Sequence, residues 1–168
     1  LCGSGELFIT NTFMPTTDTL SDLPRMGMQL QITEDFNQVS WFGRGPFENY
    51  EDRKYAAHVG LYSSTVDELN YAYIRPQETG YRTDVRWLAL QNDKGVGILV
   101  VGDPVFCFSA NHFSRDDFEN GFEKEQKHMS DSKKHPWTSL NLDYKQMGVG
   151  GDNSWGALPH PQYMLPVK

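Results

Sequence analysis

A glycine-rich loop that carries a tryptophan is the part of this chain best suited to binding chemistry. This glycine loop reads Met-Gly-Val-Gly-Gly-Asp-Asn-Ser-Trp-Gly over residues 147–156. Glycines let the backbone take positive φ angles and pack closely, and Asp152, Asn153 and Ser154 can hold the turn by local hydrogen bonds. A Trp on an irregular loop is unusual, because its large ring normally lies in a core or an interface. The loop therefore predicts a sugar site in which a pyranose stacks on Trp155 while its hydroxyls meet Asp152 and Asn153.

The carboxyl groups of the chain form no recognisable catalytic pair. A glycosidase usually needs two, about 5–5.5 Å apart for retention of the anomeric configuration or about 6.5–9.5 Å apart for inversion. The acidic candidates are Glu48, Glu51, Asp52, Glu78, Asp84 and Asp152. None of them lies in a sequence pattern that marks an acid and a nucleophile. We therefore assign no catalytic residue and expect structural or substrate-orienting roles for these groups.

Two charged clusters each have two interpretations. The acidic and basic side chains of residues 48–53 predict a salt-bridged, hydrogen-bonded turn, and the alternative is that they line the mouth of an active site. Arg82, Asp84 and Arg86 alternate along one segment and predict a charge ladder across neighbouring strands. For this second cluster, the alternative is an arginine that faces a sugar.

Sequence motifs for a metal, a phosphate or a serine nucleophile are missing. No paired spacing of the zinc type occurs among the five histidines, His58, His112, His128, His135 and His160. The glycines at 148–151 lack the Lys-Ser/Thr ending of a phosphate loop, and no helix start follows them. There is no G-x-S-x-G motif. His112, at the end of an apolar run, is either a structural residue or faces a groove.

Composition limits the class of protein. The 168 residues suffice for one domain with a sizeable core, so we predict a single domain over residues 1–168. A net charge of −7 and a pI near 5.1 argue against nucleic-acid or anionic-membrane partners, because phosphate recognition needs clustered Lys and Arg. Cys2 and Cys107 are expected to be free thiols. No apolar run approaches the roughly 20 residues of a membrane span, there is no signal peptide, and the start without Met fits a fragment of a longer protein.

Alternation of apolar and polar residues is the dominant pattern and predicts an antiparallel all-β sandwich. The expected strands are residues 7–13, 26–32, 38–42, 72–74, 83–90, 97–101, 106–113 and 140–144. Residues 91–95 predict a hairpin loop, and the continuous apolar run 97–101 predicts a strand buried on both faces. Only residues 114–122 read as a helix, with Ser114 as its cap and Gly121 at its end. The only long irregular stretch is 123–136.

Three motifs, in order, carry a family resemblance. They are WFGRGPFENYEDR at residues 41–53 (the first motif), PQETGYRTDVRW at 76–87 (the second motif) and MGVGGDNSW at 147–155. Together they resemble the C-terminal domain of the large bacterial β-galactosidases of glycoside hydrolase family 2. The resemblance covers most of the chain. It implies a two-sheet supersandwich similar to the galactose mutarotase fold, with one or two short helices, as a C-terminal fragment of a multidomain enzyme.

The resemblance also implies a function. The whole enzyme would be a retaining glycosidase that hydrolyses terminal β-galactosides such as lactose, with both catalytic glutamates in a barrel domain that this chain lacks, so the chain alone is expected to be inactive. The glycine loop would reach the active site and stack Trp155 on the sugar, although the ring could instead plug a domain boundary. The full enzyme would use Mg²⁺ and a monovalent cation, the latter held by carbonyls near residues 74–76. Its partners would be a galactoside, the other domains of its own chain and, in a homo-oligomer, further copies.

Two other functions remain open from the sequence. One is a mutarotase-like aldose epimerase that interconverts sugar anomers by general acid–base catalysis, with His112 and either Glu48 or Glu78 as the groups to test. The other is a non-catalytic carbohydrate-binding or assembly module. Aglycone preference, oligomeric state and compartment cannot be read from these residues.

Overall fold

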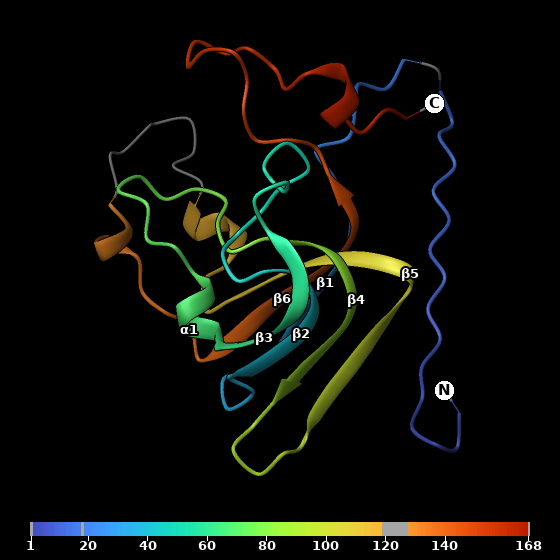
Figure 1. Ribbon diagram of the computed structural model, residues 1–168, viewed down its shortest axis with the longest axis vertical. Helices are drawn as coiled ribbons and strands as arrows, with labels where there is room; N and C mark the ends of the chain where they lie inside the picture. The colour runs from blue at the N-terminus through green and yellow to red at the C-terminus, as the bar shows by residue number, and fades with distance from the viewer. Residues whose placement is uncertain (1, 18, 119–127, 168) are drawn as a thin grey trace.

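Six antiparallel strands in a single sheet dominate the described part of the chain. The computed structural model describes residues 2–17, 19–118 and 128–167. The strand order is β1-β6-β5-β4-β2-β3, and every neighbouring pair is antiparallel (Figure 1). The strands are β1 (Arg25–Thr33), β2 (Gln38–Gly45), β3 (His58–Thr65), β4 (Arg82–Gln91), β5 (Gly97–Asn111) and β6 (Trp137–Gln146). The predicted fold class, an antiparallel all-β protein of the sandwich type, is confirmed.

Helices are short and few among the described residues. They are α1 (Val66–Leu69) and the 3₁₀ turns η1 (Arg115–Phe118), η2 (Met129–Asp131) and η3 (Pro161–Tyr163). The predicted helix over 114–122 is a single 3₁₀ turn in its described part, and residues 119–122 lie outside the described residues. Ser114 does cap it, since the backbone N–H of Asp117 donates to Ser114 Oγ at 3.3 Å. None of the described helices is long and apolar enough to cross a membrane.

The alternation predicted for β1 and β6 places their apolar side chains on one face. Leu30 pairs with Leu140 and Met28 with Leu142 across the ladder. Leu140 is fully buried, and Leu30 and Leu142 pack against the same cluster. Because side chains alternate between faces along a strand, the intervening Gln29, Gln31 and their partners on β6 fall on the opposite, polar face.

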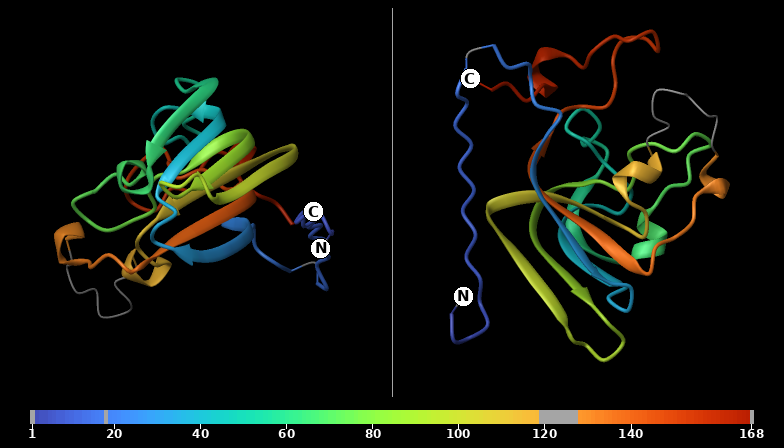
Figure 2. Two further views of the ribbon diagram at one scale, coloured as in Figure 1. Left: turned by 90° about the horizontal axis from the view of Figure 1, so that it is seen from below. Right: turned by 180° about the vertical axis from the view of Figure 1, so that it is seen from behind.

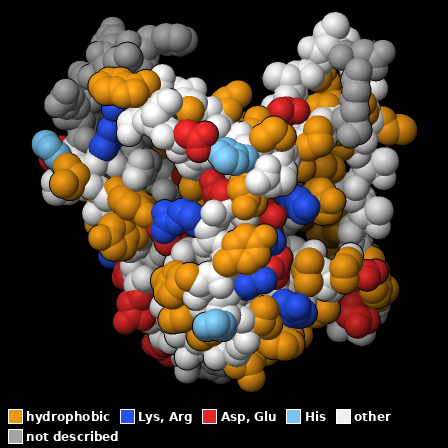
Figure 3. All heavy atoms as spheres, turned by 45° about the horizontal axis from the view of Figure 1, so that its top comes forward, with side chains coloured by type: hydrophobic (Ala, Val, Ile, Leu, Met, Phe, Trp, Pro, Cys, Tyr) orange, Lys and Arg blue, Asp and Glu red, His pale blue; other side chains and the backbone are white. Residues whose placement is uncertain are grey.

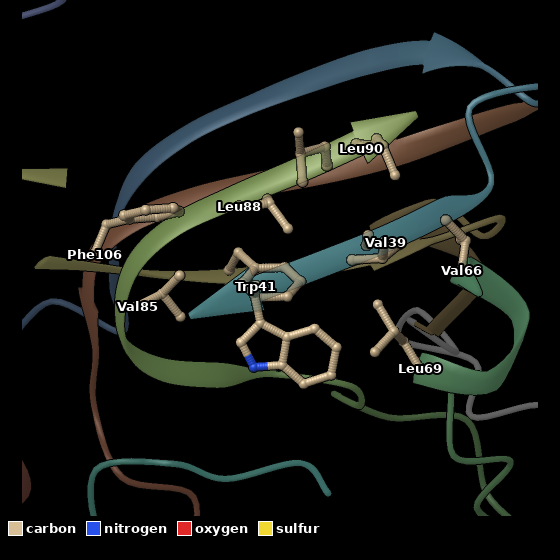
Figure 4. Packing of buried hydrophobic residues seen from close by; sticks show 11 residues of the cluster. Val39, Trp41, Val66, Leu69, Val85, Leu88, Leu90 and Phe106 are labelled. Carbon is tan, nitrogen blue, oxygen red and sulfur yellow. The ribbon is translucent and has the colours of Figure 1, made fainter. Parts of the chain in front are cut away.

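The core collects side chains from across the sheet and from α1. Trp41 and Val39 on β2 lie beside Leu88 and Leu90 on β4, and α1 adds Val66 and Leu69 (Figure 4). The indole of Trp41 meets the ring of Phe108 edge-on at 5.9 Å between centroids. Its Nε1–H donates to the Arg44 carbonyl at 3.0 Å, so the one polar group of the indole is paired.

The start of α1 is stabilised by a capping box that is visible in the sequence. Thr65 accepts a hydrogen bond from the backbone N–H of Glu68, and the Glu68 carboxylate accepts one from the backbone N–H of Thr65. This reciprocal pair is a capping box, whose Thr-x-x-Glu pattern is visible in the sequence. The missed helix is only one turn long, which explains why no period of 3.6 residues revealed it.

The predicted hairpin between β4 and β5 is confirmed, but apolar side chains of its second strand are exposed. The turn closes with the Asn92 N–H donating to the Val96 carbonyl at 2.9 Å, and Gly95 takes φ +74°. Residues 97–101 and 106–111 belong to one 15-residue strand, β5. The prediction that 97–101 is buried on both faces is wrong, since Leu99 is 66% and Val101 69% exposed. The reason is that the hairpin projects beyond the rest of the sheet (Figures 1 and 2).

Two further strand predictions are wrong, and one strand was not predicted. Residues 7–13 and 72–74 form no strand, and β3 (His58–Thr65) was not predicted. The N-terminal segment instead runs extended along one side of the molecule (Figure 2), with Leu7 and Phe8 exposed. An alternating pattern needs a neighbouring edge to become a strand, and no described strand pairs with this segment. Cys2 and Cys107 are both free thiols, as predicted.

Candidate functional site

The glycine loop follows β6 and projects from the body of the protein at the top of Figure 1. Trp155 is 93% exposed, the largest exposure among the described large hydrophobic residues. Two of the three polar side chains predicted to hold the loop, Asp152 and Asn153, make hydrogen bonds there. The Trp155 N–H donates to Asn153 Oδ1 at 2.8 Å, and Asp152 Oδ1 lies 2.8 Å from His160 Nε2. The loop therefore presents its flat ring on a hydrogen-bonded support.

The loop is fastened to the first motif by Asp52. The Gly150 N–H donates to Asp52 Oδ2 at 2.8 Å, and the Gly148 N–H donates to the Tyr163 carbonyl at 2.8 Å. A Cβ atom on Gly148 would lie 2.7 Å from Asp52 Oδ2 and 3.1 Å from Tyr163 Cβ. A side chain at position 148 would therefore require Asp52 to shift away from the loop. Two motifs nearly 100 residues apart are thus joined by a contact that fixes where the loop begins.

A buried carboxylate organises the rest of the first motif. Glu48 is 9% exposed, and its Oε2 accepts the Gly80 N–H at 2.9 Å. The Tyr73 hydroxyl donates to Oε1, the Tyr50 hydroxyl lies 3.4 Å from Oε2, and Arg53 Nη2 lies 3.7 Å from Oε1. The predicted salt-bridged turn is confirmed for Glu48 and Arg53, whereas Asp52 serves the glycine loop instead.

The second motif is tied to the first by Asn49, whose side chain is fully buried. Asn49 Oδ1 accepts from the Thr83 N–H at 3.0 Å and from the Thr83 hydroxyl at 2.6 Å, while Asn49 Nδ2 donates to the Phe47 carbonyl at 3.0 Å. Nearby, Arg82 Nη2 donates to the Pro46 carbonyl at 2.9 Å, and burial lowers the pKa of Arg82 to about 10. These side chains support the fold. In the described structure Arg82 does not face open solvent, being 4% exposed.

The second charged cluster consists of Arg82, Asp84 and Arg86. Among the described residues, only Asp84 of this cluster forms ion pairs with side chains outside its own strand. Its carboxylate lies 2.5 Å from Arg44 Nε on β2 and 3.2 Å from Lys54 Nζ. Arg82 packs over the Trp41 ring instead, and Arg86 donates to the Asp84 carbonyl. The predicted ladder is thus wrong for both arginines. The register of β4 shifts on either side of Val85, and Asp84 takes φ +52°, which breaks the regular alternation.

We expect Asp84→Asn to change the pH dependence of stability. Burial alone would raise the pKa of Asp84, but hydrogen bonds from Arg44 and Lys54 and their charges hold it below its usual value near 3.8. Asn tolerates positive φ, so the change removes charge rather than backbone fit. A carboxyl group whose pKa is lower in the folded state stabilises that state at pH values above the pKa of the group in the unfolded chain. This stabilisation is lost as the pH falls through the pKa of the group in the folded protein.

The expected result for Asp84→Asn is a deficit of about 0.5–1 kcal/mol at pH 7, reduced from the full linkage value because the pair is partly exposed. The deficit should close as the pH falls below about 4. Urea unfolding between pH 7 and pH 2 measures it, with Asp93→Asn at the exposed hairpin tip as the control. A constant deficit across this range would mean that the charge of Asp84 does not stabilise the fold.

The remaining candidates are dispersed. Glu51 pairs with Lys54 at 3.2 Å. His112 Nδ1 lies 3.2 Å from the Trp137 carbonyl, and its Nε2 lies 3.9 Å from Asp67. Glu78 borders a different hollow from the one that His112 borders, and no contact joins His112 to Glu48 among the described residues. The acid–base pairs considered for anomer interconversion are therefore not brought together.

The described residues offer no metal site of protein side chains. They contain no group of three or more His, Cys, Asp and Glu side chains that could hold an ion. Of the segment 74–76, the Ile74 carbonyl accepts the Met129 N–H at 3.3 Å. On the face shown in Figure 3, acidic, basic and hydrophobic side chains are interspersed, without a continuous basic patch.

Known proteins resemble this chain along its whole length. The family model for the β-galactosidase small chain matches residues 1–168. A β-galactosidase of Priestia megaterium is 39% identical over 98% of this chain, one of Vibrio cholerae 44% identical over 87%, and one of Pseudoalteromonas haloplanktis 35% identical over 94%. The chain spans only 13–15% of the length of these three relatives.

Proposed function

We propose, from the premise that this chain belongs to the β-galactosidase small-chain family, that it is the C-terminal domain of a retaining β-galactosidase and forms part of its active-site wall. The whole enzyme hydrolyses terminal β-galactosides of the lactose type. The relatives that bear the name β-galactosidase are several times longer than this chain. The proposal therefore concerns an enzyme to which this chain contributes one part.

The exposed ring of Trp155 is the observation that carries the proposal. An aromatic side chain buries about 150–250 Å² when it is covered. A ring left in water therefore does not gain the free energy of burying this apolar surface. The ring stands on a support fixed by the bonds of Gly148 and Gly150 to Tyr163 and Asp52. A ring held in place and left uncovered is suited to a sugar whose C–H face covers it.

Two polar neighbours complete the proposed subsite. The Asp152 side chain is 80% exposed and uses Oδ1 toward His160. Asn153 uses Oδ1 to hold the Trp155 N–H. A sugar hydroxyl could donate to the Asp152 carboxylate and accept from the Asn153 amide, since each of these groups offers several hydrogen-bond sites.

Catalysis is proposed to take place outside this chain. The carboxylates of Glu48, Glu51 and Asp84 are engaged in internal hydrogen bonds and ion pairs. Both catalytic carboxyl groups are therefore assigned to the remainder of the polypeptide, and we expect no turnover by this chain alone. Mg²⁺ and a monovalent cation are proposed for the full enzyme, and we assign no Mg²⁺ ligand to the described residues.

Trp155→Leu in the full-length enzyme tests the proposal. Loss of the stacking surface should raise KM by about 5–30-fold, equivalent to about 1–2 kcal/mol of apolar contact, with a smaller change in kcat. The measurement is the steady-state hydrolysis of a chromogenic β-galactoside, with the melting temperature recorded in parallel. Tyr55→Leu is the matched control, because this ring is also exposed, at 75%, but lies outside the loop.

The two readouts separate the roles of the ring. An increase in KM at an unchanged melting temperature supports a wall for the sugar. A lower melting temperature with unchanged KM would identify the ring as a plug between domains. If neither quantity moves, Trp155 has no part in the site.

A further inference from the structure

A polar hollow lies on the face of the sheet that is turned away from the core. It encloses about 320 Å³ and is floored by β1, β6 and β5. The floor side chains include Gln29, Ser109, Asn111, Ser139, Asn141 and Asp143. These positions alternate with core residues such as Leu30, Ala110 and Leu140, so the period of two that builds the core also builds the hollow. None of the described residues that line the hollow belongs to the glycine loop.

The floor is held by cross-strand hydrogen bonds. Asn141 lies opposite both Gln29 on β1 and Ser109 on β5 in the register. Asn141 Nδ2 donates to Ser109 Oγ at 3.0 Å, and Gln29 Nε2 donates to Ser139 Oγ at 2.9 Å. Several donors and acceptors are therefore fixed in place before any ligand arrives.

Two buried amide oxygens in the hollow have neither a hydrogen-bond nor an ion-pair partner among the described residues, unlike Asp143 Oδ2, which pairs with Arg25. They are Asn111 Oδ1 and Gln146 Oε1. Asn111 is only 6% exposed. An unpaired buried acceptor costs about 1–3 kcal/mol, and nearly all such groups in native proteins have a protein or water partner. Both atoms therefore call for an occupant that donates hydrogen bonds.

The charges around the hollow are balanced. Arg25 Nε lies 2.7 Å from Asp143 Oδ2, and Arg25 Nη2 lies 3.7 Å from Glu78 Oε1. Arg115 also borders the hollow, so two guanidinium groups face two carboxylates. An ionic ligand would meet a like charge as readily as an opposite one. The balance favours a neutral ligand.

One wall is apolar. Phe113 and Phe118 border the hollow, with ring centroids 6.0 Å apart and tilted by 51°. Opposite them stand the hydroxyl and amide groups of the floor. A ligand that suits both surfaces has C–H groups on one side and hydroxyls around its edge.

We propose that this hollow binds a neutral polyhydroxylated ring the size of a monosaccharide. Its volume lies at the lower end of the range of small-molecule sites, about 300–1,000 Å³. Ring hydroxyls donate to Asn111 Oδ1 and Gln146 Oε1 and accept from the amides of the floor, while the C–H groups meet Phe113 and Phe118. This is a second carbohydrate site, separate from Trp155 and independent of the function proposed for the loop.

An NMR titration of the ¹⁵N-labelled 168-residue chain tests the inference, with D-galactose, D-glucose and inorganic phosphate as probes. Each sugar should shift backbone amides of β1, β5 and β6 around the hollow in a saturable manner, with a Kd in the millimolar range. Phosphate should leave them unchanged. Asn111→Leu and Gln146→Leu should each raise the Kd about 2–10-fold, the loss of one hydrogen bond, whereas Trp155→Leu should not change it.

The controls separate this site from the glycine loop. Sugar shifts confined to residues 147–156 and removed by Trp155→Leu would overturn the second site and leave the loop proposal standing. If the backbone amides around the hollow shift with neither sugar, even at a sugar concentration of about 100 mM, the hollow holds only water. If Asn111→Leu fails to fold, Gln146→Leu at the end of β6 decides the question. A Kd that Gln146→Leu leaves unchanged would then count against the inference.

Discussion

Replacing Trp41 by Ala is expected to lower the free energy of unfolding by about 3–5 kcal/mol, as for other large aromatic side chains removed from a core. Trp41 is 1% exposed and lies between Tyr62 at 5.4 Å and Phe108 at 5.9 Å, centroid to centroid. The guanidinium of Arg82 covers its ring at 5.4 Å. The change therefore leaves a cavity and also uncovers a buried charge.

Urea unfolding followed by far-ultraviolet circular dichroism measures this loss. Tyr55→Ala is the control, because that aromatic ring is 75% exposed and its removal should change stability by less than about 0.5 kcal/mol. Trp41→Phe should recover much of the deficit, since it restores a ring. Equal stabilities of Trp41→Ala and Tyr55→Ala would show that Trp41 is not a centre of the core.

The second large effect is expected for Glu48→Ala, which should cost about 2–4 kcal/mol. The change removes the acceptor of the Gly80 N–H and of the Tyr73 hydroxyl. The Gly80 N–H is buried and would be left unpaired, whereas Arg53 is half exposed and can be rehydrated. The loss should therefore exceed that of a surface ion pair, about 0–1 kcal/mol.

Glu48→Gln provides the matched comparison, because the amide keeps an acceptor oxygen at nearly the same size. Its cost should be smaller than that of Glu48→Ala, and Glu34→Ala at an exposed position should be nearly neutral. Denaturant titration gives all three values. In the full-length enzyme, Glu48→Ala should also raise KM, since the first motif holds the glycine loop through Asp52. A neutral Glu48→Ala would mean that the network around Glu48 does not support the site.

The Trp41 variants test the core of the sheet, and the Glu48 variants test the hydrogen-bond network that joins the motifs. Trp41 supports the sheet, and Glu48 and Asn49 join the first and second motifs on top of it. Asp52 then fixes the start of the glycine loop. The first and second motifs are thus largely structural here, since Glu48, Asn49 and Arg82 are buried, whereas Trp155 on the loop is 93% exposed.

The sequence by itself determined the elements whose signals are local. Alternation of Met28, Leu30 and Ile32 predicted β1, and the polar turn at residues 91–95 predicted the hairpin. The polar residues before Trp155 predicted a turn held by local hydrogen bonds, and Asn153 makes such a bond. Each of these depends on the alternation of faces along a strand or on the φ angles that a few residues allow.

Tertiary structure alone decided which distant residues meet. No local pattern could show that Asp52 holds Gly150, that Asp84 sits at a break in the β4 register, or that residues 7–13 find no neighbouring strand. The hollow beside Asn111 likewise depends on the order β1-β6-β5, which brings together strands that are far apart in the chain. Side-chain alternation fixes the face on which a residue lies, but the pairing of strands decides its neighbours, and this pairing arises only when the whole sheet forms.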